Sequence, residues 1–561
     1  MSLAPPPYRD APLLSLAFCL AVGAMVRFGL LWGHDLRGAF GPDAPGAAAA
    51  ATTGIFAHPY PLHPLLIRLF ALAGGGAAQA ALLLSITAGL ATVGAAWLMG
   101  RVLTDGRDGR SVALLAAVAP LLVHGSLLRG GDALAVCLVA WGAGLGWWGA
   151  LRVGGATPST SGPRLALVAG GLLWGLSAAA KPIALPAGVL LLAAPMLGGR
   201  RCLPWLGAGL ALGALVALPF LGPLLRPEPA MGLLGSWWQP SPPTAAGLGS
   251  WVVAGAGVLF GLLQRESWTQ LAPLAGLALA GCVVAAPRRS FRIVVFFLGT
   301  GAALGVAAMM GERLQARYLA GASLGWLVLA GLALTPAQLR RGSSPGAPSW
   351  GRVLLGPLPL SFGATLLVMA NLYFWDGMAQ LRVQEEGTVA PEGFFAGWTD
   401  GWRPTEAFQD SSICGALELG RLADELAQRS PRSGVVVTLP LRDGRAWHLL
   451  GPIAAARDDL VLLELGPECC PAGPAACAAA LPGALAAAGG GSLVVPMEPA
   501  GRCETGSLPH GLQPWREALV PLVVEPGLWY GVLTVPPGPG AGLVPICTAL
   551  GGRQPALPAR P

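Results

Sequence analysis

The chain has 561 residues, of which 54% are hydrophobic and only 11% are charged, whereas about 25% of the residues of an ordinary globular protein are charged. So few charges cannot cover the surface of the several soluble domains that this length would suggest. The charge balance also changes along the chain: residues 1–375 carry 23 Lys and Arg against 9 Asp and Glu, and residues 376–561 carry 12 against 19. These numbers exclude a row of soluble domains and predict a membrane domain, 1–375, followed by a domain in a different solvent, 376–561.

The net charge of +7 does not indicate nucleic-acid binding. The arginines are scattered singly and in pairs between apolar runs, without the basic face or the aromatic platform that is typical of nucleic-acid-binding proteins. We therefore expect membrane lipid, and no nucleic acid, among the partners of the chain.

Apolar runs of about 17–25 residues fit a bilayer-spanning helix, because each helical residue rises about 1.5 Å and the hydrocarbon layer is about 30 Å thick. Runs of this kind predict an all-α polytopic membrane domain with about eleven transmembrane helices. We expect the first run to be a retained helix and not a cleaved signal peptide, because many more follow it. The runs cover residues 12–32, 77–100, 111–127, 132–151, 165–180, 182–199, 203–224, 270–287, 290–310, 318–335 and 353–375.

Basic residues in alternate loops predict the orientation, since they favour the cytoplasmic side. Loops on the amino-terminal side hold 14 Arg, against eight Arg or Lys on the opposite side. The amino terminus is therefore predicted to be cytoplasmic in an inner membrane, and eleven spans then place the carboxy-terminal domain outside the cytoplasm. A further apolar stretch, 249–264, would upset this parity if it crossed, so we assign it to an outer-surface or re-entrant helix.

The region 376–561 has the pattern of a small α/β domain. A helical pattern at 414–429 precedes a β-branched run at 434–439, and further apolar runs at 460–465, 493–495 and 529–535 are typical of strands. Six of the ten cysteines lie in this region, which favours disulfides outside the cytoplasm and leaves their pairing open. A zinc site is the alternative, although the cysteine spacing lacks the paired C-x-x-C motifs of structural zinc.

Ionisable residues at membrane depth are costly and are functional candidates by default, and those of this chain gather on the predicted outer side. The first outer loop holds Asp35 and Asp43, followed by the stretch GIFAHPYPLHPLL. Three short segments follow at later outer ends: RGGDAL, AAAKPIAL, which contains the only lysine of the chain, and ARYL. The candidates in these four segments are His58, His63, Arg129, Asp132, Lys181, Arg317 and Tyr318.

In this order, these segments resemble the GT-C superfamily of polyprenyl-phosphate-sugar-dependent glycosyltransferases. The resemblance is strongest to the bacterial branch related to protein mannosyltransferases and to the transferases that add sugars or aminoarabinose to lipopolysaccharide, and it covers about residues 10–335. It implies a polyprenyl-phosphate sugar as donor and an envelope lipid, glycan or protein as acceptor, on the extracytoplasmic face. It implies no certain cofactor and leaves a divalent metal ion open.

The resemblance also implies roles for individual residues. Asp43 is the carboxylate that activates the acceptor, and Asp132 is the second acidic residue. Lys181 and Arg317 contact the donor phosphate, the first as a point charge and the second as a bidentate fork. Further substrate contacts are expected from Arg129, Tyr318, His58 and His63.

The first loop departs from the family pattern in two ways. Ala44 follows the first-loop Asp where many members have Glu, and residues 47–51 are alanine where an aromatic side chain is expected. Acceptor or metal handling is therefore expected to differ from that of other members. Asp35 is a rival for the base, but its spacing to HPYPLHP fits less well than that of Asp43.

Each candidate also has a purely structural interpretation. Asp43 fits a solvated turn after Gly-Pro, and Asp132 fits the N-cap of the fourth span. Lys181 and Arg317 fit basic residues that extend to the membrane interface. His58 and His63 are a poor metal pair, because they are five residues apart and two prolines separate them.

Two other functions stay open at this stage. A transporter or lipid flippase would also carry buried charges, but such sites tend to lie near the bilayer midplane, often between internal repeats, and we find no repeat. A non-catalytic GT-C homologue that presents its carboxy-terminal domain to a partner is the second alternative.

Overall fold

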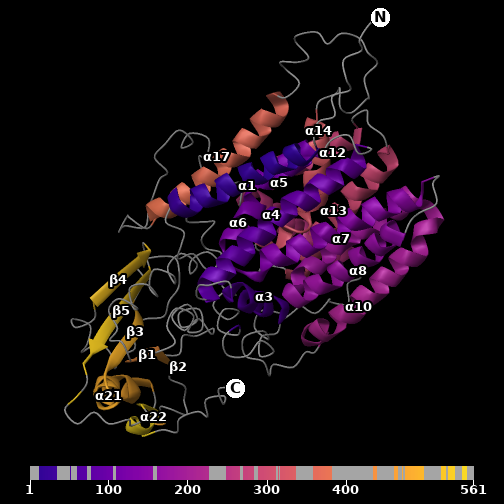
Figure 1. Cartoon of the computed structure of the whole chain (residues 1–561). Coiled ribbons are helices and arrows are strands. Elements are labelled where there is room, and N and C mark those ends of the chain that lie inside the picture. The colour runs from indigo at the N-terminus through magenta and orange to yellow at the C-terminus, as the bar shows by residue number, and fades with distance from the viewer. Residues whose placement is uncertain are drawn as a thin grey trace, which may run out of the picture.

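The computed structural model describes two regions of the chain, one helical and one that contains strands. Indigo to salmon-coloured ribbons mark the helical region in Figure 1, and orange to yellow arrows mark the strands. The described residues are 12–33, 51, 60–72, 77–104, 109–155, 161–225, 248–265, 269–283, 288–310, 314, 316–335, 358–381, 434–438, 460–464, 471, 474–497, 520–525, 528–536, 538 and 546–551.

Every predicted apolar run coincides with one helix or with a broken pair of helices. Most of the runs correspond to a single α-helix over their described residues. The run 318–335 begins in the short 3-10 helix at Ala316–Leu319, and two other runs are divided. The first divided run, 111–127, consists of α5 (Arg110–Val118) and α6 (Pro120–Leu127); the second, 182–199, consists of the 3-10 helix η3 (Pro182–Ala193) and α9 (Pro195–Gly198), with η4 (Gly199–Cys202) after it. The other helices are α1 (Pro12–Gly33), α4 (Ala77–Leu103), α7 (Gly131–Val153), α8 (Ser161–Ala180), α10 (Leu203–Leu225), α12 (Leu271–Val283), α13 (Arg289–Met310), α14 (Ser323–Leu334) and α17 (Leu358–Leu381).

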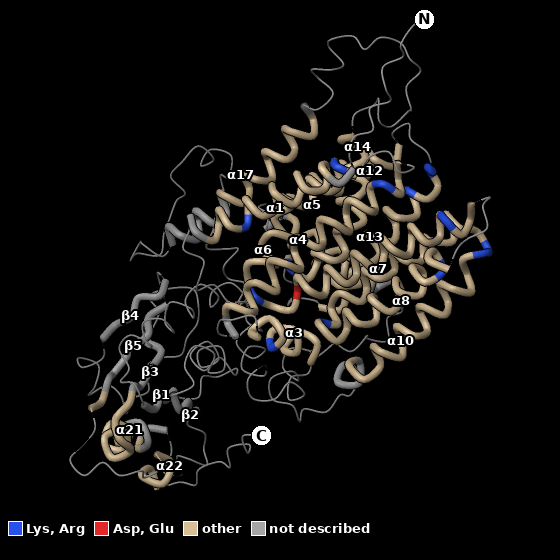
Figure 2. Tube along the Cα trace, viewed as in Figure 1, with Lys and Arg blue, Asp and Glu red and all other residues tan. Residues whose placement is uncertain are grey.

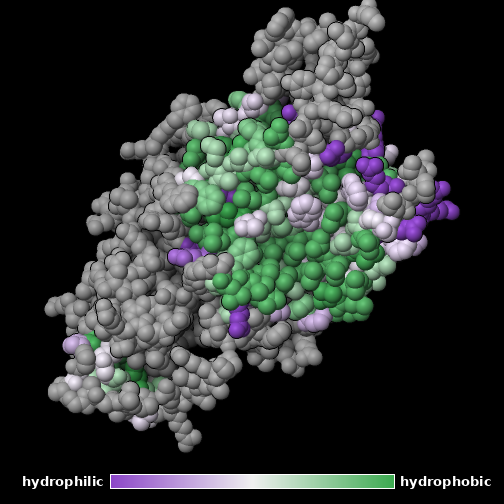
Figure 3. All heavy atoms as spheres, viewed as in Figure 1, coloured by the Kyte–Doolittle hydropathy of each residue, from purple (hydrophilic) through white to green (hydrophobic). Residues whose placement is uncertain are grey.

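The length and composition of these helices fit a polytopic membrane fold. Among the described residues, six helices are long and apolar enough to cross a membrane, or seven if the bent pair α5–α6 is one span. Their outer surface is largely hydrophobic over the middle of the helical region (Figure 3). The predicted number of eleven spans is therefore not confirmed, whereas the polytopic helical architecture is.

Two helices lie outside the predicted spans. The helix α3 (Leu62–Ala71) begins inside the HPYPLHP motif, and its residues His63 and Ile67 are buried. The helix α11 (Leu248–Arg265) corresponds to the stretch that we assigned to the outer surface. It packs closely on α13, since a Cβ atom on Gly255 would stand 2.9 Å from the carbonyl oxygen of Leu304. Its predicted position at the outer surface is not tested.

Glycines allow the central helices to approach closely. A Cβ atom on Gly175 of α8 would stand 2.1 Å from the carbonyl oxygen of Gly213 on α10, and one on Gly142 of α7 would stand 2.8 Å from that of Gly170 on α8. Small residues at membrane helix contacts permit such backbone approach. The three helices α7, α8 and α10 are therefore packed side by side (Figure 1).

The two broken runs have identifiable causes. Pro120 lacks a backbone N–H and ends the α5 hydrogen-bond ladder, and α5 and α6 meet there at 52°. In η3, proline at the start and inside the helix accompanies the 3-10 geometry. Two tryptophans bind its carbonyls: Trp174 Nε1 donates to the Leu185 oxygen at 2.9 Å, and Trp147 Nε1 donates to the Leu190 oxygen at 2.8 Å.

The region after residue 381 contains one five-stranded sheet in the order β2-β1-β3-β5-β4. The strand β1 is parallel to β2 and β3, whereas β5 is antiparallel to β3 and β4. The elements are β1 (Gly434–Thr438), β2 (Leu460–Glu464), α21 (Pro474–Ala487), β3 (Gly491–Met497), β4 (Val520–Glu525), β5 (Leu528–Val535) and α22 (Ile546–Ala549).

Four of these strands coincide with predicted apolar runs, and β4 was not predicted. The helix expected at 414–429 lies outside the described residues. Cys547 in α22 is disulfide-bonded, and the four cysteines of the helical region, Cys19, Cys137, Cys202 and Cys282, are buried. The division of the chain into two domains at residue 375 stays a prediction.

Candidate functional site

The amino terminus of α7 positions the carboxylate of Asp132. Arg129 precedes the helix with a φ of 56°, a left-handed conformation that is uncommon for a residue other than glycine and that often occurs at functional sites. Gly130 is the N-cap residue, and no side chain caps the helix. Asp132 is therefore not the N-cap that its position suggested, and its carboxylate is available to other partners.

The junction between α8 and η3 brings Lys181 to the same place. Lys181 has an extended backbone, with a φ of −169°, between the last residue of α8 and Pro182. The end of α8 lies directly against the start of α7: a Cβ atom on Gly131 would stand 2.8 Å from the carbonyl oxygen of Ala180. The absence of a side chain on Gly131 therefore allows the ammonium group to reach Asp132.

Asp132 forms ion pairs with two cations that are distant in the sequence. Lys181 Nζ lies 2.9 Å from Asp132 Oδ1 and 3.0 Å from Oδ2. Arg317 Nη1 lies 3.8 Å from Asp132 Oδ2. The exposed fractions of the three residues are 6% for Asp132, 9% for Lys181 and 4% for Arg317. Neither cation extends to the surface, so the interface-anchor interpretation does not describe them.

Tyr318 completes this group of charges. It follows Arg317 in the short 3-10 helix η7 (Ala316–Leu319), and its hydroxyl accepts a hydrogen bond of 3.0 Å from Arg317 Nη2. Lys181 Nζ lies 5.4 Å and Arg317 Cζ 4.9 Å from the centre of its ring, a distance at which an aromatic face attracts a cation. One carboxylate, two cations and one phenol therefore form a single buried cluster.

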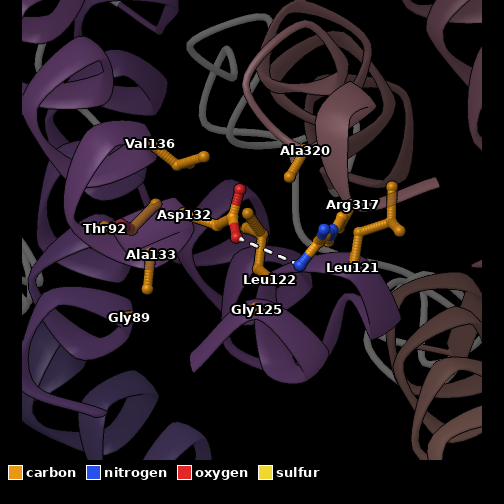
Figure 4. A pocket seen from close by; sticks show the side chains of 10 residues that line it. All are labelled: Gly89, Thr92, Leu121, Leu122, Gly125, Asp132, Ala133, Val136, Arg317 and Ala320. Atoms are coloured by element: carbon orange, nitrogen blue, oxygen red, sulfur yellow. Dashed lines mark ion pairs between the residues drawn. The ribbon is translucent and has the colours of Figure 1, made fainter. Parts of the chain in front are cut away.

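A small cavity opens beside this cluster, and the side chains of Asp132 and Arg317 point toward one another across it (Figure 4). Its volume is about 10 Å³, close to the space that one water molecule occupies. Apart from the ion pair and Thr92, its walls are apolar or glycine. The lining residues are Gly89 and Thr92 of α4, Leu121, Leu122 and Gly125 of α6, Asp132, Ala133 and Val136 of α7, and Arg317 and Ala320.

The distribution of charge sets this cluster apart from the rest of the helical region. Asp132 is the only acidic residue that the structure describes between residues 12 and 335. Figure 2 shows its red position within the helices, while most blue positions gather at the end of the helices away from α3. Two cations on a single carboxylate give the cluster a net positive charge, which suits an anionic ligand.

Of the eight predicted site residues, four meet in the cluster: Asp132, Lys181, Arg317 and Tyr318. Two more, Arg129 and His63, are buried nearby, the first three residues before Asp132 and the second next to Gly131 in space. Arg129 is 5% exposed, and the ring of His63 would lie 3.7 Å from a Cβ atom on Gly131. The proposed base Asp43, its rival Asp35 and the substrate-contact candidate His58 lie outside the described residues. No group of three or more His, Cys, Asp or Glu residues that could hold a metal ion occurs in the described part of the chain.

Arg27 is fully buried in α1 and was not among the predicted site residues. Its signal was present, because it is the only charged residue in an otherwise apolar run, and a charge at membrane depth is a functional candidate. Asn371 in α17 was overlooked as well and is 1% exposed. Both side chains donate hydrogen bonds to α5, at the break before α6.

Comparison with solved structures identifies the fold. The apo crystal structure of ArnT from Cupriavidus metallidurans matches with a TM-score of 0.51 at 16% identity, over 93% of this chain and 98% of that chain. The chain has the fold of the GT-C membrane glycosyltransferases. Together with its long apolar helices, this fold makes it a multi-pass membrane protein.

Two further structures match less closely. ArnT from Cupriavidus metallidurans bound to undecaprenyl phosphate matches with a TM-score of 0.47 at 15% identity, over 92% of this chain and 97% of that chain. The archaeal oligosaccharyltransferase AglB from Archaeoglobus fulgidus matches with a TM-score of 0.45 at 14% identity, over 81% and 64% of the two chains. No protein-family model matches the chain, and no curated protein matches it.

Proposed function

We propose that the chain is an integral membrane glycosyltransferase that moves a sugar from a polyprenyl-phosphate donor to an envelope lipid, glycan or protein. The observation that carries this proposal is the convergence of Lys181 and Arg317 on the buried carboxylate of Asp132, beside a small cavity within a GT-C fold. A lipid-linked phosphate is an anion that reaches the protein from the membrane. Two buried cations, one of them lining a cavity with mostly apolar walls, match the anionic part of such a ligand.

The proposed reaction assigns one step to each charged group. A hydroxyl or amine of the acceptor attacks carbon 1 of the sugar, and its proton passes to the carboxylate of Asp43. The bond between carbon 1 and the phosphate oxygen breaks, and the polyprenyl phosphate leaves with the bonding electrons and one more negative charge. Lys181 and Arg317 stabilise this added charge, which is larger in the transition state than in the bound donor.

Asp132 has a supporting role in this proposal. Its carboxylate holds the ammonium group of Lys181 and the guanidinium group of Arg317 near each other before the donor binds. The three side chains together carry a net charge of about +1, which balances the single charge of a phosphodiester donor. Tyr318, Arg129, His58 and His63 are the proposed further contacts to sugar or lipid.

The proposed orientation places the reaction on the extracytoplasmic face of an inner membrane, with eleven spans and an α/β domain outside the cytoplasm. Basic positions gather at the end of the helices away from α3 (Figure 2), as expected for a cytoplasmic end. The disulfide at Cys547 fits an oxidising compartment for the carboxy-terminal region. Both observations support the same orientation.

The test is transfer from a radiolabelled polyprenyl-phosphate sugar pool to envelope material. Membranes with the wild-type protein are compared with membranes with Asp43→Asn at matched expression, and Asp35→Asn is the control from the same loop. We expect one labelled product to disappear in Asp43→Asn and to persist in Asp35→Asn. The position of the label then identifies the acceptor.

Equal labelling in wild type, Asp43→Asn and Asp35→Asn would refute the assignment of Asp43 as the base. That result would favour the transport function or the non-catalytic homologue. Loss of a product only in Asp35→Asn would still support a transferase. It would identify Asp35, and not Asp43, as the base.

A further inference from the structure

The buried guanidinium of Arg27 joins α1 to the break between α5 and α6. Arg27 Nε donates to Ser126 Oγ at 2.8 Å. Its Nη1 donates to the carbonyl oxygen of Ala117 at 2.9 Å, and its Nη2 donates to that of Leu122 at 3.4 Å. One side chain on α1 therefore binds both halves of the broken helix, before and after Pro120.

The hydrogen bonds at the break explain why a charged side chain is present here. A proline that interrupts a helix leaves carbonyl oxygens without their usual N–H partners, and such groups are costly at membrane depth. Arg27 binds the freed oxygen of Ala117, and Asn371 Nδ2 of α17 binds that of Val118 at 2.8 Å. No carboxylate among the described residues pairs with Arg27, so its charge interacts with these backbone dipoles.

The segment held by these bonds forms one wall of the cavity. Leu121, Leu122 and Gly125 of α6 line it together with Asp132 and Arg317 (Figure 4). The helix α6 contacts both α7 and η7, the two elements that carry this ion pair. A displacement of α6 would therefore change the space next to both charges.

We propose that Arg27 is a positioning residue that holds α6 against the Asp132–Arg317 pair and so fixes the shape of the proposed phosphate site. Arg27 acts through α6, since all its contacts are with protein groups. That the ligand is a phosphate rests on the function proposed above, whereas the role of Arg27 in holding α6 does not.

The experiment measures hydrogen exchange and ligand binding on the full-length purified protein. Arg27→Met removes all the donors of the side chain and keeps an apolar stem. We expect amide exchange to become about tenfold faster in α6, in residues 131–136 and in residues 316–320, because local opening becomes easier. We expect the Kd for farnesyl phosphate, a short polyprenyl phosphate, to rise by about tenfold or more.

Arg292→Met is the matched control, because Arg292 is buried like Arg27, at 1% against 0% exposed, and donates to a backbone oxygen, that of Gly281 at 2.8 Å. We expect its faster exchange to stay within α12 and α13 and its farnesyl phosphate Kd to equal that of the wild type. If Arg27→Met does not fold, Ser126→Ala removes one acceptor of Arg27, together with the hydrogen bond that Ser126 Oγ donates to the Val123 oxygen within α6. We expect this variant to show faster exchange in the same segments and a higher Kd, each by about threefold.

Three results would overturn the inference: unchanged exchange in α6 of the Arg27 variant, faster exchange spread evenly over all helices, or an unchanged Kd despite a loosened α6. Absence of farnesyl phosphate binding to the wild-type protein would instead count against the proposed donor. The exchange in residues 131–136 and 316–320 would then still decide whether Arg27 positions the ion pair.

Discussion

Replacing Asp132 with asparagine should lower the unfolding free energy of the protein. It should also increase the stabilisation that added phosphate gives. The substitution keeps the size of the side chain and removes the one negative charge between Lys181 and Arg317. At an effective dielectric constant of about 20, the Lys181 pair at 2.9 Å is worth about 6 kcal/mol and the Arg317 pair at 3.8 Å about 4 kcal/mol. The desolvation of the charges offsets much of this attraction, and loss of one partner of a buried pair costs about 3–5 kcal/mol.

Phosphate should recover much of this loss in Asp132→Asn. The two cations then lack their carboxylate partner, so an inorganic phosphate ion can bind them without competing with Asp132. A ligand at about 100 times its Kd stabilises the folded state by about 2.7 kcal/mol. We therefore expect a larger phosphate-induced rise in unfolding free energy in the variant than in the wild type.

The assay is denaturant unfolding in detergent micelles, followed by the fluorescence of the 19 tryptophans. Each titration is repeated with sodium chloride at the ionic strength of the phosphate, which separates binding from screening. A double substitution, Asp132→Asn with Lys181→Met, should cost less than the sum of the two single substitutions, by up to about 3 kcal/mol. Wild-type stability of Asp132→Asn, or an equal phosphate response in both proteins, would refute the reasoning.

Two further predictions concern the packing that brings Lys181 to the site. Gly131→Ala places a methyl group 2.8 Å from the carbonyl oxygen of Ala180; we expect a loss of about 1–3 kcal/mol of unfolding free energy and weaker farnesyl phosphate binding in a titration. Gly188→Ala places one 1.9 Å from the ring of Trp174, and we expect it to lower the unfolding midpoint more strongly, because the ring must leave the carbonyl to which it donates. Gly207→Ala in α10 is the control: nothing lies within 4 Å of the added atom, so its stability should equal or exceed that of the wild type by up to about 1 kcal/mol. A loss in this control as large as that in Gly131→Ala would show that any added methyl group is harmful and that the close contact at α7 is not the cause.

The sequence alone determined the helical membrane architecture, because the property that decides it is local. An apolar run of sufficient length forms a helix in a bilayer wherever it occurs, and each predicted run is largely helical over its described residues. The number of spans was less well determined. Residues 111–127 were predicted as one span although Pro120 lies inside them, and the cost of a proline depends on whether a neighbour such as Arg27 can bind the freed carbonyls.

The sequence also selected Lys181, Arg317 and Tyr318, since each lies in a short segment that resembles a known family. It suggested an N-cap as the alternative for Asp132, and only the packed structure excluded that alternative. Gly130 is the N-cap residue, and the carboxylate of Asp132 lies 2.9 Å from the ammonium group of Lys181.

Only the tertiary structure decided which charges meet. Lys181 and Asp132 are 49 residues apart, and Arg27 and Ser126 are 99 residues apart. Their contact depends on how closely α7 approaches the end of α8 and how α5 bends into α6, which are consequences of packing among several helices. A charge in an apolar run indicates in the sequence that a partner must exist, because an isolated buried charge is too costly. The identity of that partner is a property of the fold.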